Sequence, residues 1–424
     1  MYSLPPVFPN GEPLSYETLI KRLNYFRGSF HCIQTWREPA HTARYRILVK
    51  DNIGVEEFPT MAGSMAFENL QLPDAFIVDR LIRVGVDVFG KTTMTELANF
   101  VSTTMPGGYS ELGHQGINPH GEQFSPRGSS SGSAIAVAAG FCDAALGTET
   151  SGSIVLPAMA CGVWGMKPTV GLLSRTGIVP LAHTFDTAGV LARDVKTIEY
   201  LLKVMQETDS EDPITERAHE IHLDIAGYKP GERVRVAVLV IEDEPLQYEE
   251  VQMIDDLKAK LESVNVELVT VEVPARAFDY KAITSIDFQN DMNGFLRRYS
   301  DGEHVGDVES LVQFYRAREA HHPYGFDRLT DALHYDADSD GYIDLVSDVV
   351  GRANAAIEEA LAKVQAQALI SLKFINWWAL AQAPYMAVPY GKKPDGQPIG
   401  FTLGCRQMED GKVLALAKRF EKVL

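Results

Sequence analysis

The stretch that organises this chain reads Gly128-Ser129-Ser130-Ser131-Gly132-Ser133 and, after a run of small apolar residues, Gly147-Thr148-Glu149-Thr150-Ser151-Gly152-Ser153. Glycines let backbone N–H groups approach a ligand, and serines offer hydroxyls that can attack or relay a proton. A flexible linker is also rich in Gly and Ser, but linkers do not usually run into apolar segments such as residues 134–140 and 154–158. These loops are therefore expected to be packed and to carry chemistry.

A lysine ends an apolar, strand-like run far upstream, in Ile47-Leu48-Val49-Lys50-Asp51-Asn52-Ile53. Burial destabilises the charged form of a lysine, so its pKa falls and it can act as a base. A strand-end lysine with its ammonium group in water is the ordinary case when the run is taken alone. The lysine and the two serine loops together favour a catalytic arrangement.

These segments together resemble the amidase signature family of serine hydrolases, which use a Ser–Ser–Lys triad. The resemblance spans about residues 15–424 and is strongest over residues 125–194. The segments that carry it are Lys50-Asp51-Asn52-Ile53, Ala62-Gly63-Ser64, residues 128–134, 147–157, 165–171, 185–189, 192–194, 384–389 and 396–400.

This resemblance implies roles for individual residues and no cofactor. Ser153 is the expected nucleophile, Ser129 the bridging serine and Lys50 the base. Ser130 is expected to hydrogen-bond the lysine, and the Gly128–Ser129 peptide bond is expected to be cis. The backbone N–H groups expected to stabilise the oxyanion belong to Thr150, Ser151, Gly152 and Ser153.

The implied activity is hydrolysis of the C–N bond of a carboxamide through a serine acyl-enzyme, giving a carboxylic acid and ammonia or an amine. Glu149, Ser151 and Val155 stand where much of the family has Asp, Gly and Arg, and this variant looks most like the peptide amidase group. We expect Val155 and residues 100–120 to shape the acyl pocket. The acyl and amine groups of the substrate are left open.

Two other functions share the family fold. One is an amidotransferase A-type subunit that delivers ammonia to a partner protein, and the other is a catalytically inactive binding protein. The intact set of Lys50, Ser129 and Ser153 argues against the second. Members of the family often form dimers, so a homodimer is an option that the sequence leaves open.

Composition restricts the class of protein. The 424 residues are 45% hydrophobic and 23% charged, as in ordinary globular proteins. The net charge of −18 argues against nucleic acid or an anionic membrane as a partner. The N-terminal residues do not resemble a signal peptide, no run of 18 apolar residues occurs, and the four cysteines have no paired spacing. We expect a cytoplasmic protein.

Hydrophobic patterns predict an α/β fold, and the family resemblance implies a single large mixed β-sheet surrounded by α-helices. We expect one domain over residues 1–424, with its core motifs in residues 45–195. Residues 207–230 are predicted to be a polar surface excursion, and residues 280–372 to form covering helices, including an Ala-rich helix over residues 354–372. The shorter predicted elements are a capped helix over residues 15–23, a helix over 74–83, a strand over 86–89 and a β-α-β unit over 233–273.

Three further stretches match motifs of other classes of protein. Gly85 to Thr92 fits the phosphate-binding loop formula, but Val86-Asp87-Val88-Phe89 is strand-like where that loop must be open. Residues 336–344 resemble the start of a calcium-binding loop but have Ser347 where the bidentate Glu belongs, so a solvated acidic turn is favoured.

The third match, Gly128-Ser129-Ser130-Ser131-Gly132, fits a nucleophile elbow with Ser130 as the nucleophile of a Ser–His α/β-hydrolase. This rival needs a strand directly before the elbow, which residues 123–127 do not suggest. The eleven histidines show no metal-binding spacing, so we expect no metal in the catalytic step.

Overall fold

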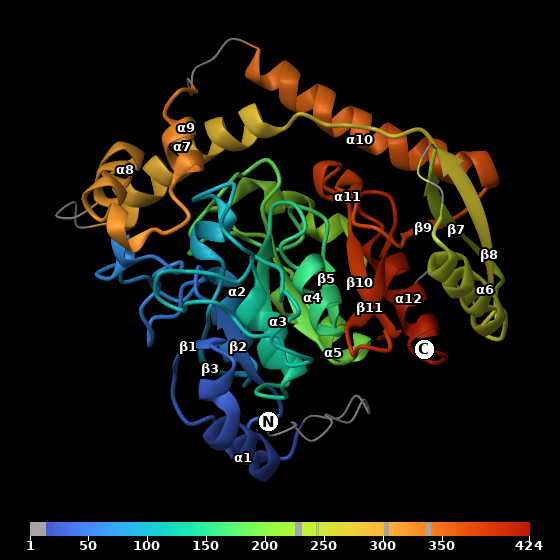
Figure 1. Ribbon diagram of the computed structural model, residues 1–424, viewed down its shortest axis with the longest axis horizontal. Helices are drawn as coiled ribbons and strands as arrows, with labels where there is room; N and C mark the ends of the chain where they lie inside the picture. The colour runs from blue at the N-terminus through green and yellow to red at the C-terminus, as the bar shows by residue number, and fades with distance from the viewer. Residues whose placement is uncertain (1–13, 225–230, 243, 245, 301–304, 336–340) are drawn as a thin grey trace.

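The computed structural model describes residues 14–424, apart from residues 225–230, 243, 245, 301–304 and 336–340. A mixed sheet of 11 strands runs through it in the order β1-β3-β2-β4-β6-β5-β10-β11-β9-β7-β8, with helices around it (Figure 1). This arrangement confirms the predicted fold class. The strands are β1 (Ile33–Trp36), β2 (Arg46–Lys50), β3 (Asp87–Thr92), β4 (Ala144–Glu149), β5 (Trp164–Lys167), β6 (Thr187–Ala192), β7 (Val234–Ile241), β8 (Val266–Val273), β9 (Ala368–Ser371), β10 (Tyr385–Lys392) and β11 (Pro398–Gly404).

Twelve α-helices and five short 3-10 helices are found among the described residues. The α-helices are α1 (Tyr16–Phe26), α2 (Phe76–Arg83), α3 (Ser131–Ala138), α4 (Val155–Cys161), α5 (Val195–Met205), α6 (Tyr248–Glu262), α7 (Lys281–Tyr299), α8 (Val308–Ala317), α9 (Asp327–Ala332), α10 (Tyr342–Val364), α11 (Trp377–Leu380) and α12 (Asp410–Phe420). The 3-10 helices are η1 (Arg27–Ser29), η2 (Met65–Phe67), η3 (Glu96–Asn99), η4 (Pro213–Glu220) and η5 (Glu319–His321).

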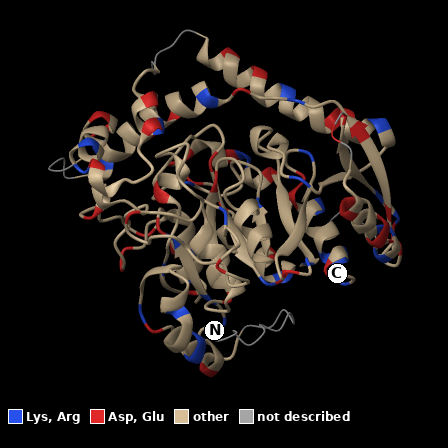
Figure 2. Ribbon diagram, in the orientation of Figure 1, with Lys and Arg blue, Asp and Glu red and all other residues tan. Residues whose placement is uncertain are grey.

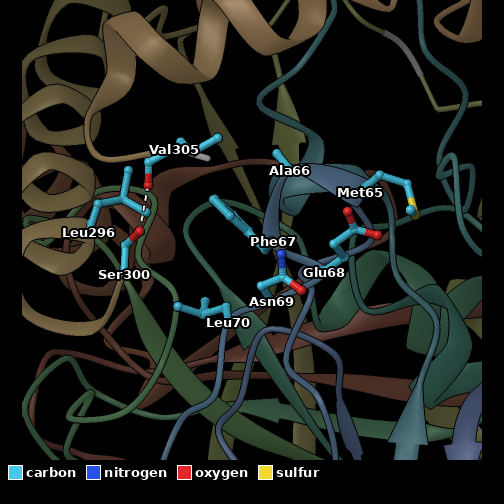
Figure 3. Close-up of a pocket in the computed structure, with 9 residues that line it drawn as sticks. All are labelled: Met65, Ala66, Phe67, Glu68, Asn69, Leu70, Leu296, Ser300 and Val305. Carbon is cyan, nitrogen blue, oxygen red and sulfur yellow. Dashed lines mark hydrogen bonds between the residues drawn. The ribbon is translucent and has the colours of Figure 1, made fainter. Parts of the chain in front are cut away.

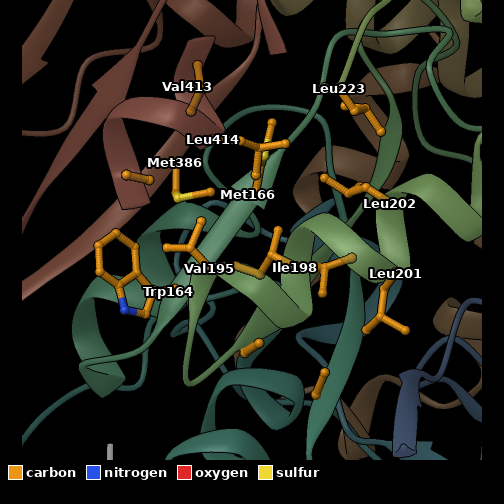
Figure 4. Packing of buried hydrophobic residues seen from close by; sticks show 14 of the residues in the cluster. Trp164, Met166, Val195, Ile198, Leu201, Leu202, Leu223, Met386, Val413 and Leu414 are labelled. Carbon is orange, nitrogen blue, oxygen red and sulfur yellow. The ribbon is translucent and has the colours of Figure 1, made fainter. Parts of the chain in front are cut away.

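Both faces of the sheet are buried, because alternate residues of the central strands enter different hydrophobic clusters. Along β2, Ile47 and Val49 join one cluster and Leu48 joins the other. The first cluster is covered by α2, α5, α6 and α12, and Figure 4 shows α5 packed there against β5 and β10. The second is covered by α1, α3, α4, α10 and α11. Since side chains alternate along a strand, Lys50 faces the same side as Leu48, toward α3 and α4.

Several predicted elements are confirmed. The first helix begins after Ser15, whose hydroxyl accepts a hydrogen bond from the Thr18 N–H at 3.3 Å. The β-α-β unit is β7, α6 and β8, and its two strands are parallel. Residues 87–92 form β3, so the sequence that fits a phosphate-binding loop is a buried strand instead.

The predicted Ala-rich helix over residues 354–372 has the wrong bounds. Helix α10 runs from Tyr342 to Val364, and residues 368–371 are the buried strand β9. Strand β9 lies between β7 and β11 in the sheet. Periodicity cannot separate a short apolar run of this kind from the end of a helix, so its burial in the sheet was not visible in the sequence.

The predicted surface excursion over residues 207–230 is also wrong in part. Asp209 and Asp212 are 5% and 7% exposed, and Asp212 forms a bidentate ion pair with Arg175, with N–O distances of 2.6 and 2.9 Å. Acidic residues were expected to lie in water, but a paired carboxylate can be buried. Residues 225–230 of this prediction lie outside the described part of the chain.

Helices α7, α8 and α9 pack on a third hydrophobic cluster together with η2 and η3, as covering helices were expected to do. In Figure 1 they form a group at one end of long α10. Acidic and basic residues are interspersed along the outer helices of the fold (Figure 2). No helix in the described ranges is both long enough and apolar enough to cross a membrane.

Candidate active site

Lys50 is the last residue of β2, an inner strand that lies between β3 and β4, and its side chain is fully buried. Its Nζ lies 2.7 Å from the Oγ of Ser129, 2.8 Å from the Oγ1 of Thr148 and 3.1 Å from the carbonyl oxygen of Thr148. Strands β2 and β4 are parallel neighbours, and their register pairs Val49 with Leu146. The side chain at the end of β2 therefore meets the end of β4.

Burial lowers the pKa of Lys50 from its ordinary value of 10.5 to about 7. The carboxylates of Asp186 and Glu149 act in the opposite direction, because negative charge favours the ammonium form. Desolvation is the larger effect. A substantial fraction of Lys50 is therefore neutral near neutral pH, and a neutral amine can accept a proton.

Ser129 is fully buried and precedes α3, and the Gly128–Ser129 peptide bond is cis, as expected. The carbonyl oxygen of Ser129 accepts a hydrogen bond from the Thr95 N–H at 3.0 Å. A side chain at position 128 would bring its Cβ within 2.1 Å of the Thr95 Oγ1. Only glycine fits there, which explains the residue directly before Ser129.

The expected hydrogen bond from Ser130 to Lys50 is not formed. The Ser130 hydroxyl instead donates to the carbonyl oxygen of Thr148 at 3.1 Å and accepts from the Thr148 N–H at 3.3 Å. Ser130 therefore fixes the backbone of the residue that contacts Lys50. The sequence could not distinguish a direct contact from one made through a neighbouring strand.

The Ser153 segment is held from both ends. The Ser153 carbonyl oxygen accepts from the Ser130 N–H at 3.0 Å, which places Ser153 beside the segment of Ser129. The carboxylate of Glu149 accepts from the N–H groups of Ile154 at 2.6 Å and Val155 at 3.1 Å. Tyr385, fully buried in β10, donates its phenol O–H to the same carboxylate.

Ser153 itself is half-buried. In the described part of the chain, no hydrogen bond joins its hydroxyl to another residue. The backbone N–H groups of Ser151 and Ser153 likewise have no acceptor among the described residues. Thr150 faces another way and donates its hydroxyl to Asp186, whose pKa burial raises to about 6. Backbone donors of this kind can stabilise a developing oxyanion.

A cavity of about 370 Å³ adjoins the site, and Asn52, Thr148 and Thr150 form part of its wall. Residues 175–183 and α7 supply most of the rest, and four carboxylates and three basic side chains line it: Asp186, Glu211, Asp212, Asp291, Arg175, His183 and Arg298. A second cavity, between η2 and α7, measures about 20 Å³ and has room for about one water molecule (Figure 3).

The expected shape of the acyl pocket differs from this cavity. Val155 is fully buried in the second hydrophobic cluster, and neither it nor residues 100–120 line the 370 Å³ cavity. The walls of the cavity next to Thr148 are formed instead by loops later in the chain and by α7. Long-range packing of this kind leaves no local signal in the sequence.

The nucleophile-elbow interpretation finds no support. No strand precedes Ser130, and residues 123–127 are irregular. The His183 imidazole pairs with Asp291 at 3.0 Å and with Asp287 at 3.5 Å, both on α7. The calcium-loop match falls largely on residues 336–340, which lie outside the described residues.

Sequence reasoning gave no role to four residues that contact the site: Asn52, Thr148, Asp186 and Tyr385. The amide of Asn52 donates to the Thr148 hydroxyl at 3.0 Å, so Thr148 receives hydrogen bonds from both Asn52 and Lys50. Asn52, Thr148 and Asp186 lie inside segments that carry the family resemblance, which was the available signal. Tyr385 sits at the start of β10 and had no local signal beyond the closing segment.

Comparison with known proteins gives consistent matches. A family model described as "Amidase" matches residues 46–326. The chain is 28% identical over 389 residues to a probable amidase of Arabidopsis thaliana, covering 89% of this chain and 76% of that protein. It is 29% identical over 408 residues to the A subunit of the glutamyl-tRNA(Gln) amidotransferase of Methanothermobacter thermautotrophicus, covering 90% of this chain and 85% of that protein.

Among solved structures, native peptide amidase from Stenotrophomonas maltophilia superposes with a TM-score of 0.87 at 28% sequence identity. The superposition covers 96% of this chain and 93% of that one. The likeness therefore extends over the whole sheet and its helices rather than over the serine loops alone.

Proposed function

The chain belongs to the amidase family, and we propose that it hydrolyses a carboxamide through an acyl-enzyme formed on Ser153. The observation that carries this proposal is the contact between the buried Lys50 amine and the Ser129 hydroxyl at 2.7 Å. A serine hydroxyl becomes an effective nucleophile when a base removes its proton. The base here is a lysine whose pKa lies near 7.

In the first half-reaction, Ser153 Oγ attacks the carbonyl carbon of the amide and forms a C–O bond. Its proton passes to Ser129 Oγ while the Ser129 proton passes to the lone pair of Lys50. The resulting ammonium then returns a proton through Ser129 to the leaving nitrogen, and the C–N bond breaks to release ammonia or an amine. Water repeats the sequence on the acyl-enzyme, which releases the carboxylic acid and restores Ser153.

Negative charge collects on the carbonyl oxygen during both attacks. The N–H groups of Ser151 and Ser153, which have no described acceptor, are the donors we assign to it, with Thr150 and Gly152 completing the loop. Loss of one such donor typically raises the barrier by about 3–4 kcal/mol. Glu149 holds the far end of this loop through the N–H groups of Ile154 and Val155.

We further propose that the substrate is a small or peptidyl carboxamide. The support is the TM-score of 0.87 to a peptide amidase and a cavity of about 370 Å³ beside Thr148. That volume accommodates a side chain or a short peptide rather than a large polymer.

The alternative function is ammonia delivery to a partner protein, which the match to the A subunit of an amidotransferase over 90% of the chain favours. A subunit of this kind would show little turnover by itself and would co-elute with a partner on gel filtration. A free-standing amidase would hydrolyse its substrate without a partner protein. Its elution volume on gel filtration would show whether it forms a homodimer.

The test of the proposed function is ammonia release from aliphatic, aromatic and C-terminal peptide amides. Wild type is run beside Lys50→Ala, Ser153→Ala and Ser130→Ala. We expect turnover to be lost in the first two variants and reduced in the third. Turnover that survives Lys50→Ala but vanishes in Ser130→Ala would overturn the proposed mechanism.

A further inference from the structure

A compact polar cluster lies away from the lysine and the serines, between η3, the loop after it and the segment that follows α8. Glu96 opens η3, Glu111 lies in the loop, and His322 follows η5. One ligand-capable atom from each of these three residues lies within 4.8 Å of the other two. The three side chains come from distant parts of the sequence, so no spacing motif announces them.

Two atoms of this cluster are buried without a partner. The Nε2 of His322 and the Oε2 of Glu111 make no hydrogen bond to any described residue. His322 is 7% exposed and Glu96 is 1% exposed. Leaving a buried polar atom unpaired is costly, so native structures supply a partner in nearly every case. Two such atoms in one cluster indicate a missing ligand that interacts with both.

We propose that Glu96, Glu111 and His322 bind one divalent transition-metal ion, with Zn²⁺ as the best match. Two carboxylate oxygens and one imidazole nitrogen form a ligand set that suits Zn²⁺ or Mn²⁺ and does not suit Ca²⁺, which prefers oxygen alone. Three protein ligands also leave a coordination position for water.

The protein also holds oxygens of both carboxylates, and the Glu111 N–H donates to the Oε2 of Glu96 at 2.7 Å. Tyr315 donates its phenol O–H to the Oε1 of Glu96, and Arg318 donates to the Oε1 of Glu111. Such outer contacts orient metal ligands. Two carboxylates and one guanidinium leave the cluster with a net charge of about −1 when Glu96 is ionised and His322 is neutral, so a divalent cation is attracted despite the arginine.

The role of this ion is structural. It joins the α8 region to η3, and η3 directly follows Thr95. The Thr95 N–H donates to the carbonyl oxygen of Ser129 at 3.0 Å, and its hydroxyl accepts from the Gly108 N–H at 2.7 Å. The ion thus braces the segment on which the bridging serine rests, without contacting the reacting atoms.

The test is Zn²⁺ binding to the full chain after treatment with a chelator, measured by calorimetry and by metal analysis after gel filtration. We expect about one equivalent of Zn²⁺ per chain and a higher melting temperature with Zn²⁺ than without it. His322→Ala should weaken binding by more than the 10–100-fold typical of losing an outer contact, and Tyr315→Phe by roughly that 10–100-fold. The matched control is His219→Ala, because the His219 side chain is 73% exposed and does not belong to the cluster.

No retained Zn²⁺ in the wild-type protein would overturn the proposal and leave a buried water as the partner of these atoms. Equal affinity in His322→Ala and wild type would overturn it as well. If His322→Ala does not fold, Co²⁺ gives a second measurement on the wild-type chain. Visible absorption from bound Co²⁺ that disappears when Zn²⁺ replaces the ion supports the site. No visible absorption on addition of Co²⁺ counts against it.

Discussion

The Nζ of Lys50 lies 2.7 Å from the Oγ of Ser129, and both side chains are closed to solvent. This contact joins the end of a central strand to the loop before α3. Because the amine is desolvated, its pKa falls to about 7, and because it touches a hydroxyl, its lone pair has a proton to accept. Burial and contact together give Lys50 the properties that the proposed base requires.

Three consecutive serines should respond differently to alanine substitution. Ser129→Ala removes the proton relay, and we expect kcat/KM for amide hydrolysis to fall by about 10²–10⁴-fold. Ser130→Ala loosens the backbone of Thr148 and should cost about tenfold, since one hydrogen bond is worth roughly 1 kcal/mol. Ser131→Ala is the control, because the Ser131 Oγ has no partner among the described residues. Equal losses in all three variants would contradict the relay.

The pH dependence of kcat/KM should report the protonation of Lys50. Its amine must be neutral to accept a proton, so the rate should rise about tenfold per pH unit below pH 7 and level off above it. Initial rates of ammonia release between pH 5.5 and 9.5 provide the measurement. A rate that stays flat from pH 6 to 9 would exclude Lys50 as the titrating group.

The stability of Lys50→Met relative to wild type should depend on pH. The unfolded chain binds a proton at Lys50 below pH 10.5, whereas the folded chain binds it only below about 7. Between these values the unfolded state of the wild type holds one more proton than the folded state, so the free energy of unfolding of the wild type rises with pH. Methionine binds no proton, so its substitution removes this pH dependence. The melting temperature of Lys50→Met minus that of wild type should therefore fall between pH 7 and 10 and be constant below pH 7.

Melting curves at several pH values would measure this difference. Lys21→Met serves as the control, because it removes a lysine that lies in water rather than in the protein interior. A constant difference for Lys50→Met would mean that the lysine keeps an ordinary pKa in the folded protein.

Tyr385→Phe should impair turnover more than substrate binding. The variant removes the O–H that Tyr385 donates to Glu149, the carboxylate that holds the loop of Ser153. We expect kcat to fall about tenfold with little change in KM, and a loss of about 1–3 kcal/mol in the free energy of unfolding. Tyr390→Phe on the same strand is the control, because Tyr390 contacts Asp256 away from the site. A rise in KM alone would indicate that Tyr385 acts on the substrate instead.

The sequence predicted the sheet, the cis bond and the pairing of Lys50 with Ser129 because each of these follows from a local motif or from its family resemblance, whereas the role of Ser153 stays a prediction. Contacts across distant segments were not predictable. Ser130 was expected at the lysine but contacts Thr148, and Val155 was expected in the acyl pocket but is core. Strand β9 resembled the end of a helix because a run of four residues, three of them apolar, has no clear period.

The most direct test is to trap the acyl-enzyme. Protein mixed with a turned-over amide is quenched in acid, digested and mapped by mass spectrometry, with Ser153→Ala and Ser129→Ala treated in parallel. We predict an acyl adduct on Ser153 in the wild type, no adduct in Ser153→Ala and a strongly reduced one in Ser129→Ala. An adduct on Ser130, or one that persists in Ser153→Ala, would contradict the assignment of Ser153 as the nucleophile.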